Sequence, residues 1–196
     1  MVDDRRVRRT RNALHEALIE LVLEKGYERI TVREILDRAD IVRSTFYAHY
    51  QDKDALLLSC FEEMLGQLRA AVATVSPADT ARPAELLYRH AFEHRRVYRA
   101  LCGRQGGNVV QRHLHRMVTD VLREHLAAPL ASAGCSLPAD LVATHYTETT
   151  LGLLGWWVDD DFRHDPDWMV RAWQTLALPG LRAALGAPER AAALSR

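Results

Sequence analysis

The 196-residue chain is 48% hydrophobic, which is enough to bury a sizeable core in one or two domains and excludes an overall disordered protein. Its 26 Lys and Arg residues balance 26 Asp and Glu residues, so bulk positive charge cannot be its means of coating nucleic acid. Three cysteines without a CxxC pair indicate reduced thiols, and the sequence has neither a signal segment nor a transmembrane stretch. We therefore expect a soluble, cytoplasmic protein with no membrane partner.

The first predicted helix runs from near Asp4 to Lys25 and ends at Gly26, a residue that favours a helix stop. Helical spacing directs four of its residues inward: Leu14, Leu18, Leu21 and Val22. Its start is basic, because arginines occupy five of the seven positions in residues 5–11. A local basic patch on a neutral body suits contact with phosphates at a specific site. Taken alone, the same pattern is also typical of a solvated N-terminal tail.

A second, short helix is predicted from Thr31. Thr31 and Glu34 have the spacing of a capping box, and apolar residues then follow with helical periodicity. Asp40-Ile41-Val42 forms the turn that ends this helix, and Ile41 is expected to fill the angle between it and the next one. The segment therefore predicts the first half of a helix-turn-helix.

A third helix is predicted from Arg43 or Ser44 to Tyr50. Phe46 and Tyr50 are four residues apart and should share the inward face. The other positions carry Arg, Ser, Thr, Tyr and His, the kind of outward face that a helix needs to enter the DNA major groove. Arg43 can make a bidentate contact to guanine, and the methyl group of Thr45 can touch thymine.

At these residues the chain resembles the tetracycline-repressor (TetR) family of bacterial regulators. The resemblance rests on Gly26-Tyr27, Thr31-Val32-Arg33-Glu34-Ile35, Ser44-Thr45-Phe46-Tyr47-Ala48-His49-Tyr50 and Lys53, and it covers about the first 60 residues. Many family members have Ala and Gly between the two helices, where this chain has Ala39-Asp40-Ile41-Val42. Asp tolerates the left-handed conformation better than most residues, so the turn remains feasible. The residues then expected to contact DNA are Thr31, Arg33, Arg43, Ser44, Thr45, Tyr47, His49 and Lys53.

The periodicity and the resemblance together imply an all-α fold of about nine helices. A three-helix DNA-binding domain is expected at residues 1–53, and a helical ligand-binding and dimerisation domain at residues 54–196. The helices expected in the second domain span about 53–75, 83–94, 95–102, 108–126, 138–158 and 167–185, with Pro129 kinking or ending the fourth.

The last two helices combine small and bulky apolar residues, a pattern that suits a four-helix bundle formed by two chains. Their C-terminal position is similar to that of the TetR dimerisation element. The residues predicted at a dimer interface are Leu151, Gly152, Gly155, Val170, Trp173 and Leu176. The alternative is that both helices simply fill the core of one chain.

A ligand pocket is implied by the resemblance, between the helices at about 83–94, 108–126 and 138–158. The residues that could line it or orient a ligand are Tyr88, Phe92, His113, Met117, Val121, Tyr146, Thr147 and Trp156. The alternative is that the aromatic residues among them only fill the core.

Other chemistry is weakly indicated. His90 and His94 are four residues apart, a spacing that can hold a metal on one helix, but no HExxH pattern or cysteine partner accompanies them. Asp159-Asp160-Asp161 is more typical of a solvated turn than of a cation site, and Cys102 of a small buried hydrophobe than of a redox sensor. We expect no metal, no cofactor and no enzymatic activity, because no catalytic motif is present.

The resemblance thus implies a homodimeric one-component transcriptional regulator that acts as a repressor. It would bind a palindromic double-stranded DNA operator and leave it when a small-molecule effector enters the body. A regulator without an effector, a metal-dependent enzyme that uses the C-terminal histidines, and an architectural DNA protein are the alternatives. The sequence does not identify the effector, the operator or the regulated genes, nor does it separate repressor from activator.

Overall fold

The computed structural model describes residues 2–103, 107–135 and 137–186. Within these ranges the secondary structure is helical and contains no strand, which confirms the predicted all-α class. None of the described helices is both long and apolar enough to cross a membrane.

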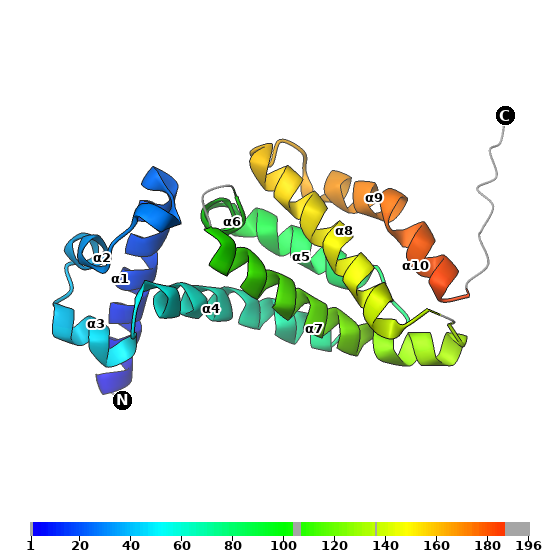
Figure 1. Ribbon diagram of the computed structural model, residues 1–196, viewed down its shortest axis with the longest axis horizontal. Helices are drawn as coiled ribbons and strands as arrows, with labels where there is room; N and C mark the ends of the chain where they lie inside the picture. Colours follow the sequence, from blue (N-terminus) through cyan, green and yellow to red (C-terminus); the bar gives the residue numbers. More distant parts are fainter. Residues whose placement is uncertain (1, 104–106, 136, 187–196) are drawn as a thin grey trace. The chain divides into compact units, whose positions relative to one another are not determined.

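The helices form two compact units (Figure 1). The first unit contains the chain up to Gln67, together with His94–Leu114 and Val158–Asp161. The second contains Leu68–Glu93, His115–Trp157 and the chain from Phe162. This is a division by packing, and the boundary expected between residues 53 and 54 on functional grounds stays a prediction.

The first unit is built on one long helix. Its elements are α1 (Val2–Lys25), the 3₁₀ turn η1 (Tyr27–Arg29), α2 (Val32–Ala39), α3 (Arg43–His49), the first part of α4 (Lys53–Ala73), and α6 (Arg95–Cys102). The four residues predicted to face inward from α1 are all buried, which confirms the reading of its periodicity. Helix α1 packs against α2 and α6, so it forms the floor on which the helix-turn-helix rests.

Two residues with positive φ shape the turns of this unit. Gly26 ends α1 with φ 80°, and Asp40 ends α2 with φ 54°, ψ 45° in the left-handed region. The expectation that Asp40 would replace the usual turn glycine is therefore confirmed. Asp is among the few non-glycine residues that visit this conformation readily.

The second unit is held together by helices from the rest of the chain. They are α5 (Arg82–Glu93), most of α7 (Gly107–Ala133), α8 (Ala139–Asp159), α9 (Pro166–Leu176) and α10 (Leu178–Ala184). Trp157 lies at the centre of one apolar cluster, with Phe92 stacked on it and Phe162 against its edge. Trp173 of α9 fills another part of the core, beside Tyr146 of α8.

Two predicted helices differ in the structure. Helix α7 continues through Pro129 to Ala133. A proline inside a helix removes one backbone N–H donor, and here the helix continues without that hydrogen bond. The helix predicted at 167–185 is instead two helices, α9 and α10, that meet at Ala177. Pro179 explains the break: it sits in the first turn of α10, where a missing N–H is tolerated, and its ring would clash inside a continuous helix.

Candidate nucleic-acid interface

The start of α2 is fixed by the predicted capping box. The backbone N–H of Glu34 donates to Thr31 Oγ1 at 3.4 Å, and the backbone N–H of Thr31 donates to Glu34 Oε2 at 2.9 Å. The Lys25 ammonium donates to the same Glu34 carboxylate. Donation from Lys25 and then from Thr31 lowers the pKa of Glu34 to about 2. The carboxylate thus ties the end of α1 to the first turn of α2.

The other end of α2 is tied to α1 by Arg38. Its guanidinium donates to both carboxylate oxygens of Glu24, at 2.8 and 2.9 Å, and to Glu20 at 3.0 Å. A planar guanidinium that meets a carboxylate with two bonds fixes orientation as well as distance. Helix α2 is therefore held at both ends, which sets the direction in which the following turn delivers α3.

The inward face of α3 is apolar and anchored. Phe46 and Tyr50 are both buried, as predicted from their spacing. The Tyr50 hydroxyl lies 3.2 Å from Ser59 Oγ and 3.4 Å from His15 Nε2, and those two atoms are 3.1 Å apart. The last turn of α3 is thereby bonded to α1 through His15 and to α4 through Ser59.

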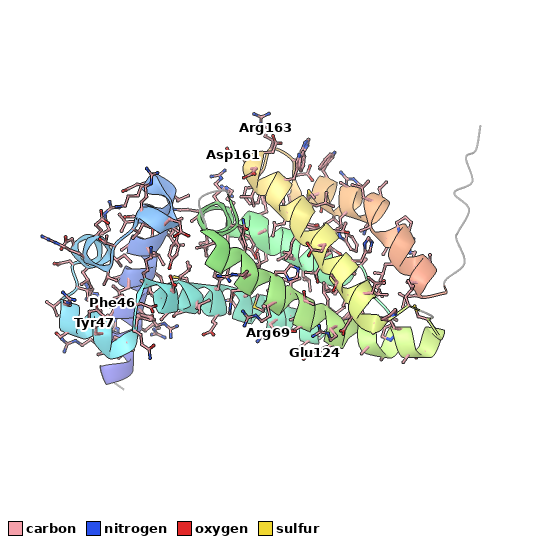
Figure 2. The ribbon with its side chains drawn as sticks, viewed as in Figure 1. Phe46, Tyr47, Arg69, Glu124, Asp161 and Arg163 are labelled. Atoms are coloured by element: carbon pink, nitrogen blue, oxygen red, sulfur yellow. The ribbon has the colours of Figure 1, made fainter. Side chains whose placement is uncertain are left out.

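The outward face of α3 carries the predicted polar residues. Arg43, Ser44, Tyr47 and His49 are exposed, and Thr45 is half-buried. The Arg43 guanidinium lies 5.4 Å from the centroid of the Tyr47 ring, so the two side chains form one surface. Phe46 and Tyr47 are neighbours in sequence on α3 but have opposite exposure (Figure 2). A short helix with an anchored apolar side and an exposed polar side is suited to entering a groove.

Three predicted contacts lie around α3 and differ in their availability. Arg33 is exposed on α2, with only a long 3.8 Å ion pair to Asp37. The Thr31 hydroxyl is occupied by the capping box, so the capping prediction is confirmed and the phosphate contact stays a prediction. The Lys53 ammonium is hydrogen-bonded inside the protein.

Lys53 Nζ donates to three backbone carbonyls, those of Tyr27 at 3.1 Å, Glu28 at 3.4 Å and Ile30 at 3.1 Å. It also lies 4.4 Å from the centroid of the Tyr27 ring. An ammonium has three donors, and all three are used here. Lys53 therefore joins η1 to the start of α4, and we do not carry it forward as a phosphate contact.

Val42 is an exposed residue that sequence reasoning assigned only to the turn. It is the N-cap residue of α3 and is 67% exposed, although it is apolar. In the sequence, the position of this apolar residue directly before the polar helix was the feature that could have indicated a contact with DNA. At this position it can contact a thymine methyl group, as Thr45 can.

The basic N-terminal residues belong to α1. Arg5, Arg8 and Arg9 are exposed and have the i, i+3 and i+4 spacing that places side chains on one side of a helix. The positive charge of these residues is therefore held on a helix and is not spread along an extended tail.

The predicted pocket residues belong to both units. Tyr88, Tyr146 and Thr147 are buried in the second unit, whereas His113 belongs to the first unit, with its ring 6.1 Å from that of Phe61. Phe92, Met117 and Val121 are half-buried in the second unit. The hydroxyl of Tyr88 donates to the carbonyl of Thr150 at 3.0 Å, and that of Tyr146 to the carbonyl of Thr80 at 2.7 Å.

Trp156 lies at the surface. It is 48% exposed, its ring is roughly parallel to that of His164 at 6.0 Å, and Trp168 lies 6.1 Å away. We therefore do not carry it forward as a pocket wall.

Two surface clefts of the second unit, of about 500 and 370 Å³, share Ala81, Leu178 and Arg182, and neither contains a predicted pocket residue. The predicted pocket stays a prediction.

The predicted dimer residues divide into exposed and buried ones. Gly152 and Leu176 are exposed, the latter to 68%, and Leu151 and Gly155 are half-buried. A Cβ at either glycine would meet nothing within 4 Å. Val170 is buried. Trp173 is 1% exposed and donates its Nε1–H to Thr150 Oγ1 at 3.0 Å, so it belongs to the core of its own chain and is not carried forward as an interface contact.

The weaker chemical indications have structural explanations. Burial raises the pKa of the Cys102 thiol to about 12, which leaves almost no thiolate for redox chemistry at neutral pH. Asp161 is paired with Arg99 at 2.7 Å. In the described part of the chain, no three His, Cys, Asp or Glu side chains are grouped closely enough to bind a metal.

Comparison with known proteins supports the helix-turn-helix. Residues 14–60, from α1 to α4, match the family described as bacterial regulatory proteins, tetR family. The helix-turn-helix of this chain is therefore identified as one of the TetR family.

One relative extends the likeness beyond the matched segment. The uncharacterized HTH-type transcriptional regulator YxbF of Bacillus subtilis is 24% identical over 160 residues, which cover 78% of this chain and 40% of YxbF. This chain therefore spans less than half the length of that relative.

Two solved structures show the same fold. A protein of Syntrophomonas wolfei assigned to the TetR family has a TM-score of 0.73 at 14% identity, covering 92% of this chain and 97% of its own. The fatty acid degradation regulator FadR of Bacillus halodurans has a TM-score of 0.69 at 18% identity, covering 88% and 96%.

Proposed function

We propose that the protein is a homodimeric, cytoplasmic repressor that binds a palindromic DNA operator through α3 and releases it when a small molecule binds the second unit. The observation that carries the proposal is the division of α3 into an anchored face and an exposed polar face, within the segment that matches the TetR family. The resemblance to that family supports the effector and the repressor role.

In this proposal the two faces of α3 have separate tasks. Arg43, at the N-terminal end of α3, reads guanine through a bidentate contact, while Val42 and Thr45 contact thymine methyl groups. Ser44, Tyr47, His49 and Arg33 contact phosphates and set the position of the helix on the duplex. The side of α1 that carries Arg5, Arg8 and Arg9 adds attraction that depends on salt but not on sequence.

A dimer supplies the second half-site. The exposed part of the α8 and α9 surface contains Gly152 and Leu176, and Gly155 leaves open space beside them. Small residues let two helices approach closely, and large exposed apolar residues lose contact with water when a second copy covers them. We propose that two copies pair through this surface, so that two α3 helices meet half-sites about one helical turn apart.

Effector binding would act by selecting one of two arrangements of the dimer. An effector shifts such an equilibrium only if it binds one arrangement better than the other. Helix α4 contains residues of both units, and its first turns hold Ser59, which bonds to Tyr50 of α3. A displacement of α4 would therefore reach α3 through this hydroxyl contact.

The dimer is tested by adding a charge at its proposed centre. Leu176→Arg and Gly152→Arg should give monomers in light scattering at micromolar concentration, and each should weaken operator binding strongly, because a single half-site remains. Leu137→Arg is the matched control, since Leu137 is also an exposed leucine but precedes α8. An unmodified protein that is monomeric at micromolar concentration, or a Leu176→Arg variant that remains dimeric, would refute this interface.

A further inference from the structure

Two buried threonines in the second unit have hydroxyl groups without a partner. Thr119 of α7 is 8% exposed and Thr147 of α8 is 0% exposed, and neither Oγ1 has a hydrogen bond within the described structure. Threonines in helices often donate to the carbonyl four residues earlier, as Thr149 does to His145 at 2.9 Å. Thr119 and Thr147 do not. An unsatisfied buried hydroxyl costs about 1–3 kcal/mol, so two of them call for an explanation.

The two hydroxyls belong to facing helices. His115 Nε2 lies 2.8 Å from Glu148 Oε1, and Arg123 Nε donates to Asp140 Oδ1 at 2.7 Å. From the first contact to the second, the residue number rises by eight on α7, from His115 to Arg123, and falls by eight on α8, from Glu148 to Asp140. The two helices therefore run antiparallel in a fixed register (Figure 1).

Thr119 lies midway between the two contact residues of α7. Thr147 lies next to Glu148 and three residues from the matching midpoint of α8, which is roughly 4.5 Å along the axis. Both threonines are thus buried at nearly the same level along the two helices.

No charged residue of the described chain is buried as a whole. The buried polar or charged residues of the described chain are Thr119, Thr147 and Thr150, and none of them is ionisable. Thr150 is already occupied, because its Oγ1 accepts from Trp173 and its carbonyl accepts from Tyr88. The Tyr146 hydroxyl is likewise bonded to a backbone carbonyl. Two hydroxyl donors therefore remain without a partner, and no charged residue is buried as a whole beside them.

We propose that Thr119 and Thr147 form the polar end of the effector site, and that the effector is an uncharged, mostly apolar molecule with a carbonyl oxygen, such as a ketone or ester. This inference rests on the proposed effector release. A carbonyl oxygen has two lone pairs, so it can accept from both hydroxyls at once. A carboxylate or an ammonium would have to give up its hydration without finding an opposite buried charge, which makes charged molecules of the same size poor ligands.

The test uses three probes of equal chain length: 2-decanone, decanoate and decylammonium. Their binding to the full chain is measured by the shift of the thermal unfolding midpoint and by titration calorimetry. We expect 2-decanone to bind and the two charged probes to bind at least 10-fold more weakly. Thr147→Val and Thr119→Val should each weaken 2-decanone binding by roughly 3- to 10-fold, the effect of one lost hydrogen bond. Thr144→Val, at an exposed threonine of α8, is the matched control and should leave binding unchanged.

Stability in the absence of probes separates a ligand site from a site for a structural water. Valine matches the shape of threonine without its hydroxyl, so Thr147→Val should raise the unfolding midpoint of the free protein if the hydroxyl has no partner. If Thr147→Val lowers that midpoint and leaves 2-decanone binding unchanged, the hydroxyl serves a structural water and the proposal is wrong.

Preferential binding of decanoate or decylammonium, or binding of none of the three probes, would also overturn it. Operator binding and dimerisation, measured without probes, report separately on the proposed function.

Discussion

The orientation of α3 depends on a few side chains whose bonding capacity is used inside the first unit. Tyr50, His15 and Ser59 form a triangle of polar atoms, with sides of 3.1 to 3.4 Å, behind the exposed face. Lys53 likewise uses all three of its N–H donors in hydrogen bonds to backbone carbonyls in and next to η1. Because these groups are occupied, the side chains left to meet DNA are those of the outward face. The set of residues that can contact DNA thus depends on which polar groups are hydrogen-bonded within the protein as well as on which side chains are exposed.

The triangle makes a prediction about stability. Tyr50→Phe removes one buried hydroxyl and should lower the free energy of unfolding by about 1 kcal/mol, measured by urea denaturation. Combined with Ser59→Ala, the loss should be smaller than the sum of the two single losses, because the two residues share a hydrogen bond. Tyr47→Phe is the control, since Tyr47 is exposed and its loss of a hydroxyl should leave stability unchanged. Equal stability of the Tyr50→Phe and Tyr47→Phe variants would show that the triangle does not anchor α3.

At the scale of elements, α2 illustrates how local sequence decides local structure. Its start is a capping box, its end is a left-handed Asp, and its sides are held by Arg38 and Lys25. The Glu34 carboxylate joins two of these features, since it accepts from the Thr31 backbone and hydroxyl and from the Lys25 ammonium. The charge of Glu34 is therefore part of the connection between α1 and α2.

This connection predicts a dependence on pH. The pKa of Glu34 falls from the ordinary 4.5 to about 2 in the folded protein, so the folded state favours the ionised carboxylate. The stabilisation is fully present above about pH 4.5 and is lost as pH falls from there towards 2. The stability difference between the unmodified protein and Glu34→Gln should accordingly be constant from pH 5 to 7 and shrink below pH 4.5. A carboxyl titration of Glu34 by NMR with a midpoint near 4.5 would contradict the expectation.

Elements whose ends are set by local chemistry could be predicted from the sequence. Helices α2, α3 and α6 lie within a residue of their expected bounds, because caps, turns and amphipathic spacing act over a few residues. The break between α9 and α10 was missed, although Pro179 carried the signal, because apolar periodicity continues on both sides of it.

Which side chains meet a partner could not be predicted in the same way. The spacing that placed Trp173 on an interface is equally compatible with the core, and only its contacts with Thr150 and Tyr146 decide between them. Lys53 has the sequence context of a phosphate contact, but in the structure its ammonium donates to backbone carbonyls in and next to η1. Helical periodicity gives no information on the position of those carbonyls. The lack of a hydrogen-bond partner for the Thr147 hydroxyl likewise could not be predicted, because it depends on the positions of all neighbouring donors and acceptors.

At the scale of the whole molecule, zero net charge and a basic start of α1 describe a protein that attracts DNA locally and depends on specific contacts for affinity. One α3 helix of seven residues reads too few bases to define a unique site. Recognition of a unique site therefore requires two copies of the protein and a symmetrical operator.

The most direct test is selection of bound duplexes from a random DNA pool by the unmodified protein. We expect the selected duplexes to be enriched in an inverted repeat whose half-site centres lie about 10 base pairs apart. The Arg43→Ala, Tyr47→Ala double variant should lose affinity for it, and Arg43→Ala alone should cost about 1–3 kcal/mol and relax one base preference. Arg69→Ala, at an exposed arginine of α4 labelled in Figure 2, should bind the repeat as well as the unmodified protein does. No enriched repeat, or a double variant that binds the repeat with undiminished affinity, would contradict the claim.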